Sequence, residues 1–353
     1  MKREIFVGSV GIGGSHPVSI QSMTNTDAED VAGTLKQIAR LRAAGCDIVR
    51  VAVPQKSALP AFKRIVARSL LPVIADIHFD ASLALGALEN GAHGVRINPG
   101  NIGGNDKLKA IIRLAAQKHV PIRIGVNAGS LEKKYRRPGL ATPAAMVASL
   151  LDKVKFFEDQ GFLDMKISLK SHDARETVAA NRLADRRCNY PLHVGVTEAG
   201  SYFAGSIRSA MGIGSLLLDG IGNTIRVSLT ADPVREIRVA REILAAAGLA
   251  RSGIDVVSCP TCARASVDLI PLAAAFEKKA GRLRFPGRLR VALMGCEVNG
   301  PGEAGNADIG LAFSRKQAFL FRQGKIVART EPGEAIPRLM ELIAELAAER
   351  SHG

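Results

Sequence analysis

The residues with the most evident chemical potential are three cysteines in the last third of the chain. Cys259 and Cys262 stand in SCPTCAR, directly after a predicted strand, and their C-x2-C spacing lets one turn aim two thiolates at a metal centre. Pro260 helps to stiffen that turn. Cys296 lies in MGCEVNGPGEA at the end of another predicted strand, so neighbouring strands could bring the three thiols together.

Three cysteines are one ligand short of a four-thiolate zinc or iron–sulfur site, so the fourth ligand must be a different side chain. The histidines after Cys188 are His193 and His352, and neither is a good candidate within the second domain. The GPGE turn offers Glu303 instead. A carboxylate is a hard, weakly held ligand of iron, and a cluster with such an exchangeable corner can bind a substrate oxygen there. This combination indicates chemistry at the cluster, while a structural zinc clamp and a redox dithiol remain the alternatives.

The other two cysteines, Cys46 and Cys188, have no metal-site spacing, and we interpret both as plain buried or surface thiols. Five cysteines are few and odd in number, which fits reduced thiols or metal ligands better than a secreted disulfide framework. A reducing, cytoplasmic location is therefore expected, and the first residues of the chain show no apolar segment typical of a secretion signal.

A second set of candidate residues is cationic and recurs at the carboxyl ends of short β-branched runs. Guanidinium groups bind phosphate oxygens in bidentate fashion. Several of them directed into one opening at the carboxyl ends of these strands, the mouth of the fold, would therefore suit a diphosphate. Lys170 ends the run KISLK and is expected to lie nearer that mouth than Lys166, which makes it the better phosphate ligand. The four arginines of this set are Arg50, Arg96, Arg123 and Arg226.

Candidate acid and base groups accompany these cations. Asp76 and His78 in ADIHFD are two residues apart and so share a strand face, where they could orient a substrate hydroxyl, relay a proton or form a buried structural pair. Glu198 in GVTEAG and Asn127 in GVNAG complete the set. Glu198 should stay ionised among so many cations, so an acid role for it would require local desolvation.

The elements that must position these residues alternate regularly. After an apparent N-terminal hairpin, eight short strand-like runs are each followed by an amphipathic stretch, which predicts βαβ units and an α/β fold with a closed (β/α)8 TIM barrel. A doubly wound sheet is the alternative, but no GxGxxG follows the first strand, and the VGIGG run is interpreted as turn glycines. The eight runs are Val18 to Ser22, Ile48 to Val53, Val73 to His78, Gly94 to Asn98, Ile122 to Asn127, Met165 to Lys170, Leu192 to Thr197 and Thr224 to Ser228.

A helix from Pro233 to Ala247, stopped by Gly248, is expected to complete a barrel domain of residues 1–250. Residues 254–353 then predict a smaller α+β domain that holds the three clustered cysteines. Its expected strands are Ile254 to Val257, Arg288 to Leu293, Ile309 to Phe313, Gln317 to Phe321 and Ile326 to Arg329, and its expected helices are Ser266 to Lys279 and Gly333 to Glu349.

The charge of the chain limits its partners. The 353 residues carry 48 Lys and Arg against 33 Asp and Glu, a net charge of +15, which attracts polyanions, phosphorylated metabolites or an acidic protein. Aromatic residues make up only 4% and no nucleic-acid-binding motif is present, so nucleic-acid binding is not expected. Every long apolar stretch is interrupted by charges, so no membrane span is expected either.

Together these motifs resemble 4-hydroxy-3-methylbut-2-enyl diphosphate synthases. The resemblance spans nearly the whole chain in the expected order and rests most specifically on CPTC paired with GCxVNGPGEA. The other matching motifs are IQSMTNTD, ADIHFD, VRINPGNIG and PLHVGVTEAG. The resemblance implies the penultimate step of the non-mevalonate isoprenoid pathway, the two-electron ring opening and dehydroxylation of 2-C-methyl-D-erythritol 2,4-cyclodiphosphate.

The resemblance also implies a set of roles. A 4Fe-4S cluster would be held by Cys259, Cys262, Cys296 and Glu303, with Glu303 on the iron that meets substrate. Asp76, His78 and Glu198 would lie near the reacting carbons. The diphosphate would be bound by Arg50, Arg96, Arg123, Asn127, Lys170, Arg226 and Ser228.

The partners implied by the resemblance are a reduced flavodoxin or ferredoxin as electron donor and a second copy of the chain. In the family's head-to-tail homodimer, the cluster domain of one chain covers the barrel mouth of the other. Two alternatives stay open: a non-redox barrel enzyme for a phosphorylated or pterin-like substrate with a structural zinc, and a basic nucleic-acid-binding protein with a zinc-ribbon-like module.

Overall fold

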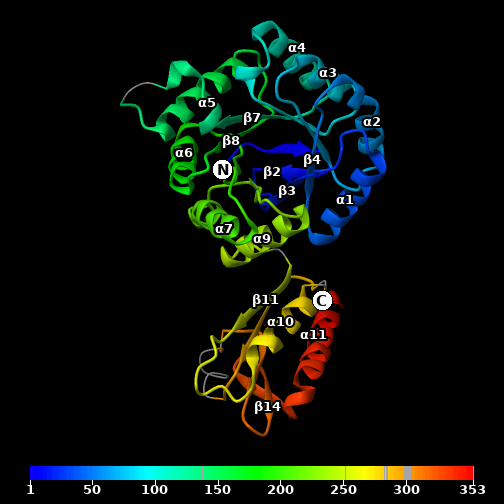
Figure 1. The fold of residues 1–353 in the computed structure, drawn as a ribbon, viewed down its shortest axis with the longest axis vertical. Coiled ribbons are helices and arrows are strands. Elements are labelled where there is room, and N and C mark those ends of the chain that lie inside the picture. Colours follow the sequence, from blue (N-terminus) through cyan, green and yellow to red (C-terminus); the bar gives the residue numbers. More distant parts are fainter. Residues whose placement is uncertain are drawn as a thin grey trace. The chain divides into compact units, whose positions relative to one another are not determined.

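The structure is a computed structural model that describes residues 1–136, 139–250, 252–281, 283, 285–297, 304 and 306–352. The chain divides into two compact units, Met1–Leu249 and Ala250–Gly353, and Figure 1 traces both. Within the described ranges, no helix is long and apolar enough to cross a membrane.

The first unit is built around eight parallel strands, in the order β8-β7-β6-β5-β4-β3-β10-β9. A parallel bridge between Ile167 and Leu192 joins the two ends of this order, so the sheet closes into a barrel. The predicted (β/α)8 barrel is thus confirmed, with seven strands inside their predicted runs and β3 extending one residue beyond its run, to Met23. The strands are β3 Ser19–Met23, β4 Ile48–Ala52, β5 Val73–Asp76, β6 Gly94–Ile97, β7 Ile122–Asn127, β8 Met165–Lys170, β9 His193–Val194 and β10 Thr224–Ile225.

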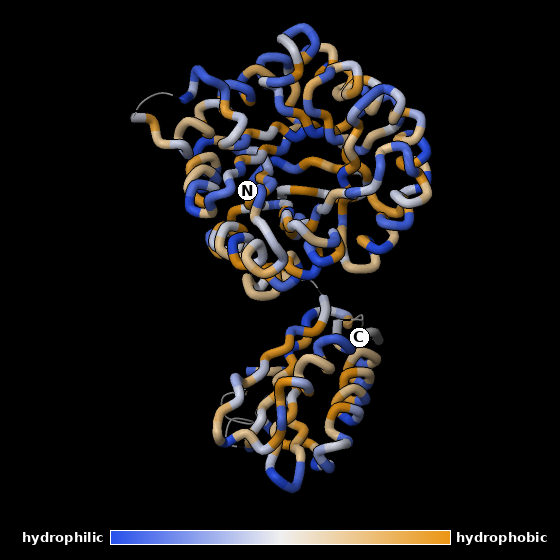
Figure 2. Tube along the Cα trace, in the orientation of Figure 1, coloured by the Kyte–Doolittle hydropathy of each residue, from blue (hydrophilic) through white to orange (hydrophobic). Residues whose placement is uncertain are grey.

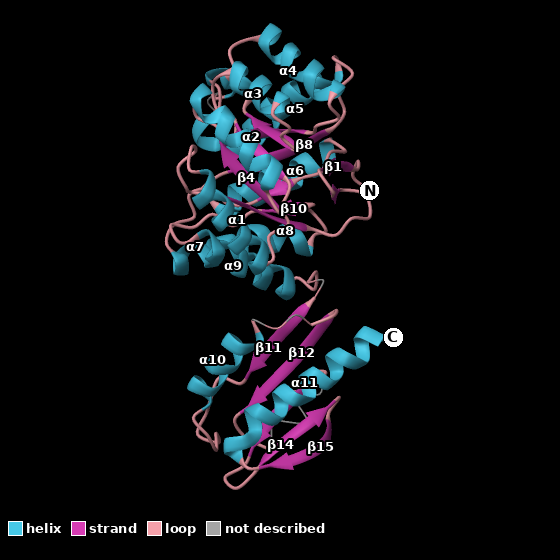
Figure 3. Cartoon of the chain, turned by 90° about the vertical axis from the view of Figure 1, so that its right-hand side faces the viewer, coloured by secondary structure: helices cyan, strands magenta, loops and turns pink. Residues whose placement is uncertain are grey.

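Helices surround these strands, as Figure 3 shows for the barrel unit. Aspartates at the ends of the connecting loops start four of them, because each carboxylate accepts a hydrogen bond from a free N–H of the first turn. Their buried residues pack on the sheet, and Figure 2 shows hydrophobic residues along the strands. The helices are α1 Val31–Ala44, α2 Leu59–Arg68, α3 Ala81–Glu89, α4 Asn105–Gln117, α5 Thr142–Glu158, α6 Ala174–Arg187, α7 Tyr202–Ser209, α8 Ser215–Leu218 and α9 Pro233–Ala246.

The predicted N-terminal hairpin consists of β1 Ile5–Val7 and β2 Val10–Ile12. Its apolar residues pack against Ile48 and Ile74, which lie at the amino ends of β4 and β5. The hairpin therefore covers the floor of the barrel. The VGIGG run ends in a turn, as interpreted from the sequence, because Gly13 adopts a left-handed φ of 84° and its Cα lies too close to the Arg3 carbonyl to carry a side chain.

The second unit has one mixed sheet, in the order β11-β12-β13-β14-β15, in which the first three strands are parallel and the last two are antiparallel additions. Two helices contribute to the same apolar core as the sheet. The elements are β11 Gly253–Ser258, α10 Leu269–Ala280, β12 Arg288–Met294, β13 Ile309–Phe313, β14 Ala318–Arg322, β15 Lys325–Thr330 and α11 Ala335–His352.

One helix of this unit begins later than the sequence indicates. The expected start was Ser266, whereas α10 begins at Leu269. The backbone N–H of Ser266 donates to the Gly295 carbonyl (2.7 Å), and the N–H of Ala265 donates to the Cys262 carbonyl (2.9 Å). The first bond ties the segment after the C-x2-C turn to the residue that follows β12, and the second closes the turn itself, so the helix starts only beyond them.

Candidate functional site

The interior of the barrel is lined by cations where such barrels usually carry branched apolar side chains. Arg50 of β4, Arg96 of β6, Arg123 of β7 and Lys170 of β8 are all buried, and Arg226, one residue past β10, is half-buried. Lys166, expected further down β8, is buried as well. The structure thus brings the four predicted arginines and Lys170 to the inside of one barrel.

Asp76, at the carboxyl end of β5, is the carboxylate that contacts this group among the residues the structure describes. Its oxygens lie 3.5 Å from Arg50 Nε, 3.2 Å from Arg96 Nη1 and 3.3 Å from His78 Nε2. Burial raises the pKa of Asp76, but the Arg50 charge, the His78 hydrogen bond and the Arg96 charge together bring it below its usual range. Asp76 is therefore an ionised anchor that orients two guanidinium groups, and the more exposed His78 lies beside it.

Several buried donors of this group have no acceptor in the described part of the chain. They are Nε and Nη1 of Arg123, Nε of Arg96, Nε of Arg226 and Nζ of Lys166. Arg50 donates to the sulfur of Met23, a weak acceptor, at 3.0 Å. Buried polar groups are normally hydrogen-bonded, so unmet donors of one charge sign mark a place for an anion.

The charge balance leads to the same conclusion. Six formal cations, the four arginines with Lys166 and Lys170, face one contacting carboxylate. Burial lowers the pKa of Arg50 to about 9, and burial together with the neighbouring arginines lowers the pKa of Arg123 and Lys170 well below their usual ranges. A bound polyanion would relieve this repulsion, and the several unmet donors suit a group with many oxygens, such as a diphosphate.

Lys170 is held from the side of β9. Its Nζ lies 3.3 Å from Nε2 of His193, a fully buried residue that we did not single out as a site residue from the sequence. A Cβ on Gly195 would lie 2.9 Å from the same Nζ and 2.3 Å from the Arg226 carbonyl oxygen, so a side chain there would displace Lys170. The sequence signal that could have identified His193 is the alternation of side chains along a strand, which places His193 and Gly195 of HVG on the same face.

The remaining predicted residues lie around the same end of the barrel. Asn127 pairs in register with Lys170, and both Asn127 and Ser228 are half-buried. Glu198 follows β9 with a left-handed φ of 52° and is exposed, so the barrel unit by itself does not supply the desolvation that an acid role would require.

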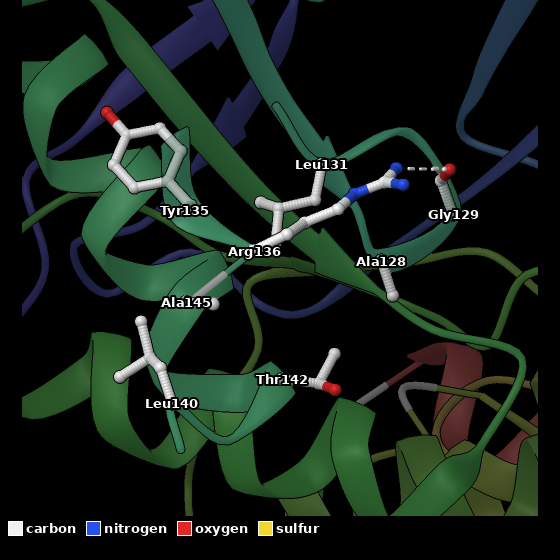
Figure 4. A pocket seen from close by; sticks show the side chains of 8 residues that line it. All are labelled: Ala128, Gly129, Leu131, Tyr135, Arg136, Leu140, Thr142 and Ala145. Atoms are coloured by element: carbon white, nitrogen blue, oxygen red, sulfur yellow. Dashed lines mark hydrogen bonds between the residues drawn. The ribbon is translucent and has the colours of Figure 1, made fainter. Parts of the chain in front are cut away.

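A shallow pocket lies beside Asn127, in the segment between β7 and α5 (Figure 4). Arg136 extends across it and donates to the Gly129 carbonyl at 3.1 Å. Glu132 anchors the segment to α5, because it pairs with Lys153 and accepts a hydrogen bond from Ser149. The pocket is lined by Ala128, Gly129, Leu131, Tyr135, Arg136, Leu140, Thr142 and Ala145.

The cysteines of the second unit follow neighbouring parallel strands. Cys259 comes directly after β11, and its sulfur accepts a hydrogen bond of 3.2 Å from the Gly295 N–H, next to Cys296 at the end of β12. Cys262 is exposed, and the backbone N–H and side chain of Arg264 lower the pKa of its thiol. Glu303 lies outside the described residues. Within those that are described, no three His, Cys, Asp or Glu side chains form a metal site.

The two remaining cysteines are ordinary thiols. Burial raises the pKa of Cys46 to about 12, and its sulfur lies 3.1 Å from the Ile48 carbonyl. Cys188 is half-buried, burial raises the pKa of its thiol, and it donates to the Ala184 carbonyl.

Comparison with known proteins gives matches over both units. The GcpE TIM-barrel domain matches residues 2–241, and the GcpE protein C-terminal domain matches residues 255–345. The 4-hydroxy-3-methylbut-2-en-1-yl diphosphate synthase (flavodoxin) of Geobacter sulfurreducens is 51% identical over 349 residues, 99% of this chain and 98% of the relative. The protein of the same name from Caldanaerobacter subterraneus subsp. tengcongensis is 48% identical over 350 residues, with the same shares covered.

Among solved structures, the N-acetylneuraminic acid synthetase of Leptospira borgpetersenii covers 70% of this chain and 90% of its own, with 14% identity and a TM-score of 0.50. At that identity the likeness concerns the fold alone.

The unmet donors predict that the chain binds inorganic pyrophosphate without any other ligand. Millimolar pyrophosphate should raise the thermal midpoint clearly more than sulfate at equal ionic strength, because a ligand that binds only the folded state stabilises it. Arg123→Leu should weaken binding about tenfold or more, since a hydrogen bond to a charged group is lost. Arg113→Leu, an exposed residue on α4, is the matched control. Equal affinity in the two variants would contradict the site.

Asp76→Asn is expected to lower the free energy of unfolding by about 3–5 kcal/mol at pH 7, because it leaves two buried guanidinium groups unpaired. The pKa of Asp76 is lower in the folded than in the unfolded chain, so its stabilisation is complete above pH of about 4 and is lost as the pH falls further. Urea unfolding at pH 7, 5 and 3.5 should show a difference in the free energy of unfolding between wild type and variant that becomes smaller only at pH 3.5. A difference independent of pH would refute the ion-pair role, and Asp106→Asn, a fully exposed carboxylate, serves as control.

Proposed function

The chain belongs to the GcpE family, and we propose from that premise that it is a 4-hydroxy-3-methylbut-2-en-1-yl diphosphate synthase. The proposed reaction reduces 2-C-methyl-D-erythritol 2,4-cyclodiphosphate by two electrons, opens the ring, and removes a hydroxyl oxygen as water with proton uptake. The observation that carries the proposal is the cluster of buried, unsatisfied cations around Asp76 in the barrel, which suits a diphosphate.

The barrel cations would serve both binding and catalysis. In the cyclic substrate both phosphates are esterified within the ring, and opening the ring frees one diphosphate oxygen to carry charge. Arg50, Arg123 and Lys170 are already buried and directed inward, so they would stabilise this new charge without reorganising. Arg96, Arg226, Asn127 and Ser228 would complete the contacts with the diphosphate.

Asp76 would act through its neighbours. Its ion pairs hold Arg50 and Arg96 in place, and its contact with His78 fixes that imidazole at the end of β5. We assign His78 and the exposed Glu198 to the region of the reacting carbons.

The second unit would hold the redox cofactor. Its donor set fits a 4Fe-4S cluster, because three thiols follow the carboxyl ends of neighbouring strands, and the lowering of the Cys262 thiol pKa by Arg264 favours the thiolate that iron requires. Cys259, Cys262, Cys296 and Glu303 are the proposed ligands. When bound, the cluster would pass the two electrons of the reduction, one at a time, from the electron donor to the substrate. The Gly295 N–H, which donates to Cys259 Sγ, would stabilise the thiolate form of that ligand.

The electron donor is proposed to be a reduced flavodoxin, as the names of the relatives indicate, with ferredoxin as the alternative. Such carriers are acidic, and the net charge of +15 favours an encounter with them. A cytoplasmic location belongs to the same proposal, since thiol ligands need reducing surroundings.

A head-to-tail homodimer is the proposed assembly, in which the second unit of one chain covers the barrel mouth of its partner. Large apolar side chains on segments after the barrel strands support a covered mouth: Phe79, three residues past β5, is 71% exposed, and Phe203 on α7 is 76% exposed. Aromatic side chains, phenylalanine among them, are enriched in protein interfaces relative to the rest of the surface.

The cofactor proposal is tested by metal content. Protein reconstituted without oxygen should contain about four iron and four sulfide per chain with the visible spectrum of a cubane cluster. Cys262→Ser should lower both contents sharply, whereas Cys188→Ser should leave them unchanged, because Cys188 donates to a helix carbonyl in the barrel unit. One bound zinc without sulfide would overturn the redox function and favour the structural-zinc barrel.

The assembly is tested by mixing two inactive variants. Arg123→Leu impairs the barrel and Cys262→Ser impairs the cluster, so neither chain should turn over alone. In a head-to-tail dimer, mixed dimers hold one site with an intact barrel and an intact cluster, so denaturing and refolding an equimolar mixture should restore about a quarter of wild-type activity. If each barrel used the cluster of its own chain, no activity would return. Refolded wild type measures the recovery of the procedure.

A further inference from the structure

A fully buried histidine lies beside the diphosphate cations and has no role in the proposed reaction. His193 belongs to β9, which pairs with β10 on one side and reaches β8 through the Ile167–Leu192 bridge on the other. Its Nε2 lies 3.3 Å from Lys170 Nζ, and its Nδ1 lies 3.4 Å from Thr224 Oγ1. The imidazole therefore connects a phosphate-binding lysine to a hydroxyl on the opposite neighbouring strand.

The chemistry of these contacts fixes the tautomer. A bound diphosphate favours the protonated form of Lys170, and an ammonium group can only donate hydrogen bonds, so Nε2 of His193 must accept. The imidazole proton then lies on Nδ1, where it can be donated to Thr224 Oγ1. Burial and the charges of Lys170, Arg123, Lys166 and Arg50 lower the pKa of His193 well below its usual range, which keeps the ring neutral.

A neutral acceptor has a specific advantage at this position. A carboxylate beside Lys170 would orient it but would also cancel the charge needed for phosphate. The imidazole orients the ammonium through one hydrogen bond and leaves its charge in place. In the described part of the chain, His193 is the hydrogen-bond partner of Lys170 Nζ, so two N–H donors remain for phosphate oxygens.

The residue that follows β9 provides space for the ammonium. Gly195 lies two residues beyond His193, and a Cβ there would approach Lys170 Nζ to 2.9 Å. The segment His193–Gly195 thus supplies both an acceptor for Lys170 and the room in which its Nζ lies.

We propose that His193, oriented by Thr224, is a positioning residue that holds the Lys170 ammonium in place for the diphosphate. The inference deepens the proposed function, since it concerns how the barrel recognises that substrate. If the proposal holds, the contributions of His193 and Lys170 to the binding free energy are coupled. A histidine that only fills the core would contribute independently of Lys170.

The decisive measurement is a double-mutant cycle on pyrophosphate binding, which needs neither the cluster nor turnover. His193→Phe keeps an aromatic ring but removes the acceptor, and it should weaken binding about tenfold, the scale of a lost hydrogen bond to a charged group. In a Lys170→Met background, His193→Phe should change the affinity little, because the group that it positions is gone. Equal losses in both backgrounds would overturn the proposal.

Two further variants separate positioning from stability. His193→Gln retains a side-chain acceptor and should recover most of the affinity, and His93→Phe, a half-buried histidine that accepts from the Val73 N–H at the amino end of β5, should leave affinity unchanged. If His193→Phe does not fold, nitrogen-15 NMR of the wild-type histidines decides: the Nδ1-protonated tautomer supports the proposal, and a proton on Nε2 refutes it.

Failure of this inference is distinguishable from failure of the proposed function. A chain that binds pyrophosphate through coupled His193 and Lys170 but holds no iron would retain the positioning role and lose the redox assignment. In the active enzyme, His193→Phe should raise the KM for the cyclic diphosphate and also lower kcat, because Lys170 is proposed both to bind the diphosphate and to stabilise the charge freed by ring opening. An unchanged KM would count against positioning.

Discussion

The constraint on which the barrel depends is an excess of positive charge in a place that excludes water. Six cations exposed to water would cost the folded state little free energy. In this barrel they lie inside a closed sheet, with one carboxylate in contact, so their desolvation is costly. Such a group persists only because the surrounding structure is stable enough to hold it. The apolar outer faces of the strands, packed against the helices, supply that stability, and the hairpin covers the floor beneath. The barrel is thus prepared for an anion before one arrives.

Part of the net positive charge of the barrel unit lies in its interior and not on its surface. Residues 1–249 contain 33 Lys and Arg against 22 Asp and Glu, a net charge of +11, and the six interior cations less Asp76 account for five of these charges. Nearly half of the barrel's excess charge is therefore directed inward. A surface attraction for acidic partners depends on the remainder, so the net charge of the chain overstates it.

The sequence predicted the barrel well because its strands are β-branched runs that end in polar residues, and each pattern is local. It predicted the ends of β9 and β10 less well, since Leu192 to Thr197 and Thr224 to Ser228 are longer than the two-residue ladders observed. It did not predict the role of His193, because the contacts that define it come from Lys170 and Thr224, 23 and 31 residues away. Asp76 and His78 were recognisable as a pair, but the two arginines that make Asp76 an anchor lie on β4 and β6, and the pairing of these strands with β5 brings them together.

The separation of thiols and cations into two units follows from the same electrostatics. The proposed cluster ligands, three thiolates and a carboxylate, would carry negative charge, and in the barrel they would pair with the arginines and occupy the donors that a diphosphate would need. On a separate unit, Cys262 obtains its local stabilisation from Arg264 instead, and Cys259 obtains it from a backbone N–H. The barrel donors that have no acceptor in the described part of the chain then stay available until substrate binds. A reaction that needs both an anion-binding site and an anionic metal site is therefore best served by a chain that folds them apart.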